Sequence, residues 1–197
     1  MKYLFIGAHG DDIELSCGGF IHRLIQEGNE VTCLALSDCF VESLPQEMNE
    51  SMEVLGVKYS QIANFERRVF PENRQRILDY LIQIREQNGP FDVVVTHDPN
   101  DRHQDHRATG QESIRAFGAT TILTYCSPFN SLSLNENYFV KLSYENIHKK
   151  IDALNCYASQ SQRVYMNEEY IKGQALLRGI QSGCKFAEGF NFYRGTI

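Results

Sequence analysis

Imidazole and carboxylate side chains are concentrated in two short segments of the sequence. One runs from His9 to Glu14 and reads His-Gly-Asp-Asp-Ile-Glu. The other runs from His97 to His106 and holds half of the six histidines, together with three aspartates. Two imidazoles with one or two carboxylates suit a borderline divalent ion, most naturally zinc, and a catalytic site leaves one position open for water. The two segments therefore predict a catalytic metal site.

Each of these residues also has an ordinary structural role. Asp11 or Asp12 could cap a helix that starts near Ile13. Asp98 before Pro99 is typical of a turn, and a single histidine on a surface is commonly only solvated. These alternatives weaken when the residues are taken together, because burying adjacent aspartates and several histidines without a cation is costly.

Buried strands and amphipathic helices alternate along most of the chain. Short apolar runs followed by Gly or turn residues predict strands, and apolar residues at helical spacing with Gly or Pro stops predict helices. This alternation indicates βαβ units and a mainly parallel sheet. The strands are expected at 3–8, 30–36, 91–96 and 122–125, and the helices at 13–27, 46–55, 71–87 and 103–117.

The last third of the chain is less regular. A polar segment rich in Ser and Asn at 127–137 predicts a loop, and 139–142 a further strand. Helices are expected at 145–157 and 168–180. The aromatic stretch 186–193 is interpreted as a closing strand on the core, although it could also stack against a sugar.

The two polar segments follow two of the expected strands, 3–8 and 91–96. In an open parallel sheet, ligands bind outside the carboxyl ends of the strands, near the point where strand order reverses. If these two strands are neighbours there, the segments face each other across one crevice. The fold class expected is therefore α/β, a Rossmann-like three-layer fold with a mainly parallel sheet, in one domain over residues 1–197.

Composition excludes several classes of protein. The 197 residues carry a net charge of −6, so no basic field favours nucleic acid. No apolar run approaches the roughly 20 residues that span a bilayer, and a cytoplasmic location is expected. The six cysteines form no CxxC pair and are expected to be reduced. The sequence leaves the oligomeric state open, and a homo-oligomer is possible.

The motifs resemble those of a known family, the PIG-L/LmbE-like zinc N-deacetylases. His9 to Glu14, with Gly18-Gly19 following, looks like the family's AHPDDxE…GG signature, and His103 to His106 looks like its HxDH signature. The tail is similar to the family's Lys…SQ…RG…AEaF pattern. One departure is Gly10, where the family usually has Pro, so the turn that holds His9 loses a fixed backbone angle. The tail pattern is carried by Lys150, Ser159-Gln160, Arg178-Gly179 and Ala187 to Phe190.

The resemblance implies a role for each motif residue. His9, Asp12 and His106 would hold zinc, although Fe²⁺ is possible with such ligands. Asp11 would be the general base. His103 would stabilise the oxyanion or protonate the leaving amine, and Asp105 would orient His103 and raise its pKa.

Four further residues are candidates for substrate contact. Glu14 lies one helical step beyond the ligands, but a glutamate in a first helical turn also favours the helix dipole. Asp101 flanks His103. Arg67 and Arg68 precede Pro71 on an expected loop near the strand ends, where they could contact a phosphate or sugar or simply be solvated.

The resemblance implies an N-acetylated amino sugar or its conjugate as the small-molecule substrate. One alternative is a metalloenzyme acting on another amide or ester, such as a formamide or carbamoyl compound. A second is a binding module that holds a sugar or nucleotide without turnover, which would need neither a base nor an acid. A nucleotide-binding oxidoreductase is poorly supported, because no GxGxxG follows the first strand.

Overall fold

The computed structural model describes residues 1–127, 129–130 and 135–195. Within these residues, seven strands form one sheet in the order β3-β2-β1-β4-β5-β7-β6. The first five strands of that order are parallel, and β7 runs antiparallel to both β5 and β6. The strands are β1 (Lys2–His9), β2 (Glu30–Ser37), β3 (Tyr59–Ile62), β4 (Val93–His97), β5 (Thr121–Tyr125), β6 (Tyr138–Leu142) and β7 (Phe186–Arg194).

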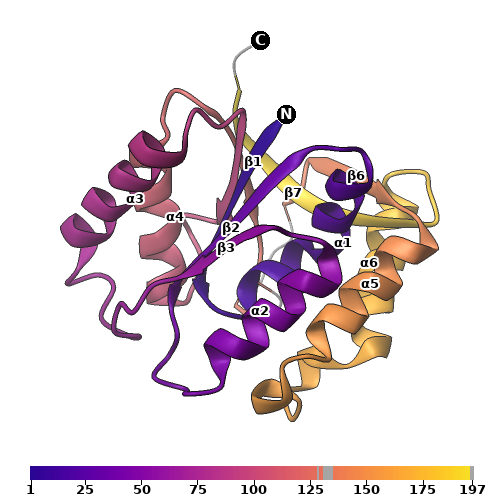
Figure 1. Cartoon of the computed structure of the whole chain (residues 1–197). Helices are drawn as coiled ribbons and strands as arrows, with labels where there is room; N and C mark the ends of the chain where they lie inside the picture. The colour runs from indigo at the N-terminus through magenta and orange to yellow at the C-terminus, as the bar shows by residue number, and fades with distance from the viewer. Residues whose placement is uncertain (128, 131–134, 196–197) are drawn as a thin grey trace.

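Helices cover both faces of the sheet (Figure 1). α3 and α4 contact each other and share one apolar core with the sheet, whereas α1, α2, α5 and α6 share the other. The mainly parallel three-layer α/β fold is confirmed. The helices are α1 (Asp12–Gln26), α2 (Leu44–Leu55), α3 (Arg74–Asn88), α4 (Gln104–Ala116), α5 (Tyr144–Leu154) and α6 (Glu168–Gln181), with short 3₁₀ turns η1 (Ala158–Gln160) and η2 (Val164–Met166).

The apolar run of β1 is explained by burial on both faces. Tyr3 and Phe5 belong to the core under α1, and Leu4 and Ile6 belong to the core under α3 and α4. Side chains alternate across a strand, so a strand covered on both faces needs apolar residues at consecutive positions. Phe5 pairs with Cys33 of β2 on one side and with Val95 of β4 on the other.

Some elements differ from the sequence-based expectation; α5, expected over 145–157, ends at Leu154. α3 begins at Arg74 rather than at 71, because residues 69–73 form a turn around the fully buried Phe70. β3 was not expected, since its four residues carry no apolar run and pair only with β2. Part of the loop expected at 127–137 (residues 128 and 131–134) lies outside the described residues, and the described remainder contains no helix or strand.

The tail residues of the expected motif pattern hold α1 against the sheet. The Glu188 carboxylate accepts hydrogen bonds from the backbone N–H groups of Gly19 and Phe20 and forms a buried ion pair with Lys150 at 2.6 Å. A Cβ on Gly19 would lie 2.5 Å from Leu142 Cδ1, so any larger residue here would force the Leu142 side chain to shift. The described residues form no disulfide, and no described helix is long and apolar enough to cross a membrane.

Candidate metal centre

The candidate site forms where β1 and β4 lie side by side. β2 and β3 lie beyond β1, and β5 lies beyond β4, so strand order reverses between these two strands. β1 ends at His9 and leads through a turn into α1, and β4 ends at His97 and leads through a loop into α4. The two polar segments therefore meet at one sheet edge, as the sequence predicts.

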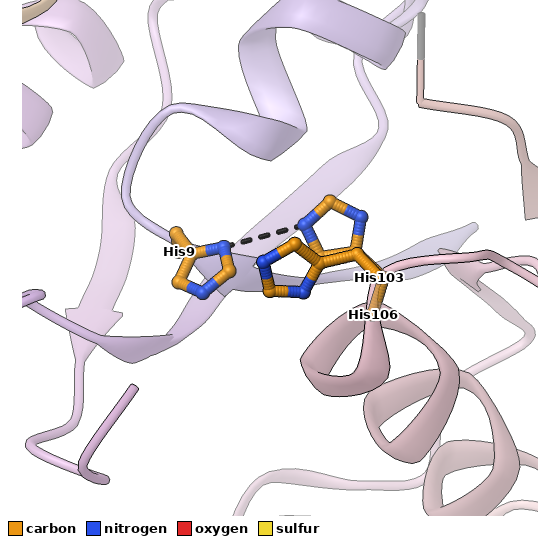
Figure 2. A group of neighbouring side chains, drawn as sticks. All are labelled: His9, His103 and His106. Atoms are coloured by element: carbon orange, nitrogen blue, oxygen red, sulfur yellow. Dashed lines mark hydrogen bonds between the residues drawn. The ribbon is translucent and has the colours of Figure 1, made fainter. Parts of the chain in front are cut away.

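Three of the predicted ligands converge. His9 Nδ1 lies 3.2 Å from Asp12 Oδ2 and 3.3 Å from His106 Nε2, and His106 Nε2 lies 3.5 Å from Asp12 Oδ1. Figure 2 shows the close approach of the His9 and His106 rings from two separate elements. A tetrahedral ion with ligand bonds of about 2.0–2.1 Å separates its ligand atoms by about 3.3–3.4 Å. Each of the three separations is close to that spacing, with one Asp12 oxygen facing His9 and the other facing His106.

Carboxylates hold the outer nitrogen of both imidazoles. His9 Nε2 lies 3.3 Å from Asp105 Oδ2, and His106 Nδ1 lies 3.2 Å from Asp101 Oδ2. Each ring therefore directs one nitrogen toward Asp12 and the other toward a second aspartate, which is Asp105 for His9 and Asp101 for His106. Histidines that bind metals characteristically have this arrangement, because the outer carboxylate fixes the tautomer and makes the ligand more basic.

The charges in the cluster favour a cation. Burial alone would raise the pKa of Asp12, but the imidazoles of His106, His97 and His9 outweigh it and lower this pKa well below its usual range. Burial would likewise lower the pKa of His9, yet Asp12 and Asp105 raise it well above its usual range. Asp12 is thus ionised, and a cation bound through His9 would have to displace a proton from it.

His97 lies beside the cluster and was not among the predicted ligands. Two overlapping groups have ligand atoms that lie within 4.8 Å of one another; one is His9, His103 and His106, and the other is Asp12, His97 and His106. The Nε2 atom of His97, however, accepts a hydrogen bond from the Ala8 N–H at 3.0 Å, so its lone pair is engaged. Burial, together with the neighbouring His106, lowers the pKa of His97 to about 4 and keeps the ring neutral.

Asp11 fits the predicted role of base better than that of a helix cap. It occupies the N-cap position of α1, but its side chain makes no capping hydrogen bond. It lines a cavity of about 300 Å³ together with His9, Asp12, His103 and His106. Burial, followed by the charge of Asp12, raises the pKa of Asp11. A carboxylate with a raised pKa accepts a proton more readily near neutral pH.

The surroundings of His103 differ from the expectation. Its Nδ1 atom accepts a hydrogen bond from the Asp105 backbone N–H at 3.2 Å, while the Asp105 carboxylate faces His9 and the backbone N–H of Arg68. Burial, followed by the charges of His106 and His9, lowers the pKa of His103. The resting ring is therefore neutral, and its Nε2 carries the proton. The Asp105 carboxylate therefore orients the His9 ring, and not the His103 ring as the resemblance implies.

The four candidate substrate residues occupy different places. Arg67 and Arg68 line the cavity. Asp101 is buried between His106 and the backbone N–H of His103. Glu14 is fully buried and is not among the cavity-lining residues of the described chain.

Glu14 belongs to a buried polar chain under the turn that follows His9. Its Oε1 atom lies 2.6 Å from the Tyr157 hydroxyl, which donates a hydrogen bond to the Gly10 carbonyl. Burial raises the pKa of Glu14 to about 8, so its proton can reach the Tyr157 oxygen while the Tyr157 proton reaches Gly10. Tyr157 thereby anchors the turn at the position where the expected Pro is Gly.

Several cavity residues were not selected from the sequence. Ser127 follows β5, the next strand beyond β4, and its Oγ lies 3.1 Å from His106 Nδ1. Ligands bind outside the carboxyl ends of strands in a parallel sheet, so the position of Ser127 after β5 could have identified it from the sequence. Gln160 belongs to the tail pattern of the resemblance but was not selected as a site residue, and nothing in the sequence pattern marked Cys39, Arg163 and Tyr165.

Comparison with known proteins settles the family. The model of the PIG-L family, described as GlcNAc-PI de-N-acetylase, matches residues 4–117, which include both polar segments. The chain belongs to the PIG-L family. A diacetylchitobiose deacetylase of Thermococcus kodakarensis is 26% identical over 228 aligned positions, covering 100% of this chain and 84% of the relative. An uncharacterised deacetylase of Escherichia coli, YaiS, is 31% identical over 162 positions, covering 77% of this chain and 87% of the relative.

Solved structures share the PIG-L fold with this chain. The conserved protein TT1542 of Thermus thermophilus superposes with a TM-score of 0.83 at 23% identity, covering 100% of this chain and 96% of the other. GalB of Pseudomonas putida, a 4-carboxy-2-hydroxymuconate hydratase, superposes with a TM-score of 0.78 at 19% identity, covering 100% of this chain and 98% of GalB. The fold therefore accommodates a hydratase as well, and the reaction has to be argued from the site.

Proposed function

We propose that this PIG-L protein is a metal-dependent N-deacetylase that hydrolyses the acetamide of an N-acetylated amino sugar or its conjugate. The observation that carries the proposal is the triangle of His9, Asp12 and His106, with an aspartate behind each imidazole and the Asp11 carboxylate beside it in one cavity. The names of both relatives include deacetylase, and one acts on an acetylated disaccharide by name.

The donor set indicates which ion the site would hold. Two imidazoles and one carboxylate with a position left for solvent are typical of catalytic zinc, and Fe²⁺ is compatible with the same ligands. An ion held there would polarise the acetyl carbonyl and lower the pKa of water to about 7. His9, Asp12 and His106 are its ligands in this proposal.

Asp11 supplies the proton transfers. Its carboxylate accepts a proton from the attacking water as the water oxygen bonds to the acetyl carbon. The protonated Asp11 then gives that proton to the sugar nitrogen as the carbon–nitrogen bond breaks, so acetic acid and the free amine leave and exchange a proton in solution to become acetate and an ammonium ion. General acid–base help of this kind contributes about 10²–10⁴ in rate.

His103 acts on the developing oxyanion. Because its Nδ1 atom accepts the Asp105 backbone N–H, a neutral ring has only the Nε2–H to donate. A neutral imidazole is a poor acid, so its contribution is a hydrogen bond to the carbonyl oxygen as that oxygen gains charge. The structure therefore favours the oxyanion role over protonation of the amine.

The cavity favours a small substrate. Its volume of about 300 Å³ lies at the lower end of the range for small-molecule sites, about 300–1,000 Å³. This suits one sugar ring with a modest substituent.

The test is a deacylation screen on purified protein with metal analysis of the same sample. N-acetyl, N-formyl and carbamoyl amines are supplied, and released amine and acid are measured before and after chelation and re-addition of Zn²⁺ or Fe²⁺. The proposal predicts acetate release that is lost on chelation and recovered with metal. Preferred formamide cleavage would assign another amidase, and saturable sugar binding without turnover in metal-loaded protein would assign a binding module.

A further inference from the structure

Ser159 and Gln160 belong to the tail pattern of the sequence, and no step of the proposed reaction uses them. Both lie in η1, on the segment that follows α5. Gln160 lines the cavity of the metal centre, whereas Ser159 does not. Gln160 is only 8% exposed, so its amide has little contact with bulk solvent. An amide group placed at this cavity is a candidate for contact with the substrate.

A chain of hydrogen bonds from α2 determines which way the Gln160 amide faces. Glu47, in the first turn of α2, accepts the Ser159 backbone N–H at 2.9 Å and the Ser159 hydroxyl at 2.5 Å. A carboxylate has no proton to donate, so the Ser159 hydroxyl gives its proton to Glu47 and retains only lone pairs. Gln160 Nε2 lies 2.9 Å from that hydroxyl oxygen. Only the N–H₂ end of an amide can bond to such an oxygen, so the order of donors fixes the orientation of the Gln160 amide.

This orientation leaves the amide oxygen of Gln160 to the cavity. Its Oε1 atom has no hydrogen-bond partner among the described residues, since the Nε2 end faces Ser159. The backbone is held as well, because the Gln160 N–H donates to the Tyr157 carbonyl and the Gln160 carbonyl accepts the Arg163 N–H, both at 3.0 Å. Water can satisfy Oε1 in an open cavity. A sugar that fills a cavity of about 300 Å³ displaces such water, and the oxygen is then left unpaired unless the sugar supplies a donor.

We propose that Gln160 binds the substrate through Oε1, which accepts a hydrogen bond from a hydroxyl group of the amino sugar, and that Glu47 and Ser159 position its amide. The proposal rests on the deacetylase function proposed above and adds a specificity contact to it. Hydroxyl groups are the donors that a sugar offers in greatest number, and an amide oxygen accepts from them without the cost of burying a further charge.

A set of substrates and three variants test the proposal. The substrates are the methyl glycoside of N-acetylglucosamine, its deoxy analogues that each lack one hydroxyl, and the O-acetyl glucoside in which oxygen replaces the acetamide N–H. The variants are Gln160→Met, which removes the acceptor at similar length, and Glu47→Gln, which alters the chain outside the cavity lining. Gln162→Met is the matched control, because Gln162 is exposed and does not line the cavity. kcat/KM and metal content are measured for each combination.

We expect one deoxy analogue to lose about fivefold or more in kcat/KM with the wild type, which is the worth of one hydrogen bond. Gln160→Met should lower kcat/KM for the parent substrate by a similar factor and become insensitive to the same missing hydroxyl, because both changes remove one contact. A general disturbance of the fold would instead lower kcat/KM equally for every substrate. Gln162→Met should match the wild type throughout.

Glu47→Gln should weaken the same discrimination without touching the cavity. The glutamine side chain can present its N–H₂ group to the Ser159 oxygen, which frees the Ser159 proton to bond to Gln160 Oε1. The Gln160 amide then turns its oxygen away from the substrate. Full discrimination in Glu47→Gln would overturn the positioning role of Glu47. If Gln160→Met does not fold, Glu47→Gln makes the comparison between the parent and deoxy substrates.

Failure of the two proposals is distinguishable. Equal kcat/KM for the parent and all deoxy substrates with the wild type, or an undiminished deoxy effect in Gln160→Met, would overturn the contact while the deacetylase function stands. Coupling of Gln160 only to the O-acetyl replacement would also overturn it, because the acetamide N–H would then be the donor. If no acetamide is hydrolysed, the deacetylase function fails, and the Kd values of methyl glucosaminide and its deoxy analogues on metal-loaded protein decide the contact. The same coupling would uphold it, and its absence would overturn it.

Discussion

Asp101→Asn changes only one atom of the group behind His106. Asp101 Oδ2 lies 3.2 Å from His106 Nδ1, and Oδ1 accepts the His103 N–H at 2.7 Å. The carboxylate places the imidazole proton on Nδ1, which leaves the Nε2 lone pair facing His9 and Asp12. Asparagine retains the acceptor for His103 but presents an amide N–H₂ to Nδ1. That favours a proton on Nε2, the atom that would bind the ion.

The size of the effect follows from this exchange of tautomers. Loss of a carboxylate behind a metal-binding histidine costs about 10- to 100-fold in metal affinity, or about 1.4–2.7 kcal/mol. The Asp101 side chain is only 3% exposed, and asparagine has the same shape, so the substitution should weaken metal binding rather than disturb packing. Zn²⁺ affinity is measured by competition with a chromophoric chelator, and activity is measured at saturating metal.

Asp98→Asn is the matched control. Asp98 lies in the same loop, and its Oδ1 accepts the Asn100 N–H at 2.8 Å without contacting an imidazole. The affinity of the Asp98→Asn variant for Zn²⁺ should equal that of the wild type. Equal affinity in Asp101→Asn and wild type, or an equal loss in both variants, would refute the assignment of Asp101 to His106.

Further predictions concern catalysis and stability. Asp11→Asn should keep the wild-type metal content and reduce turnover about 10²–10⁴-fold, as measured by acetate release. Tyr157→Phe should destabilise the protein by about 1–3 kcal/mol in urea unfolding, because it leaves buried oxygens unpaired, whereas Tyr144→Phe, on an exposed ring, should not. Lys150→Met should cost about 3–5 kcal/mol in the same assay by leaving the Glu188 charge buried, and adding Glu188→Gln should recover part of this loss.

The sequence was sufficient to predict the parallel core of the fold. Continuous apolar runs such as those of β1 and β4 occur where helices cover both faces of a strand, so the layered architecture follows from them. β3 escaped prediction because an edge strand of four residues needs no such run. The start of α3 was also missed, since the turn before it is held by the distant Asp105 through the Phe70 N–H.

The clustering of the candidate ligands was predictable from the sequence, and their supporting contacts were less so. Strand-end position and motif resemblance identified His9, Asp12 and His106, which the fold brings together. The spacing of residues could not show that Asp105 faces His9, because that depends on where α4 lies relative to β1. Arg163 likewise reaches the cavity from a late, irregular segment that no local pattern connects with it.

The most direct test of the account is a crystal of the metal-loaded protein measured on both sides of the zinc absorption edge. The account predicts one anomalous peak about 2.0–2.2 Å from His9 Nδ1, His106 Nε2 and an Asp12 oxygen. A peak bound to His97 in place of His9, or zinc found only at the protein surface, would contradict it.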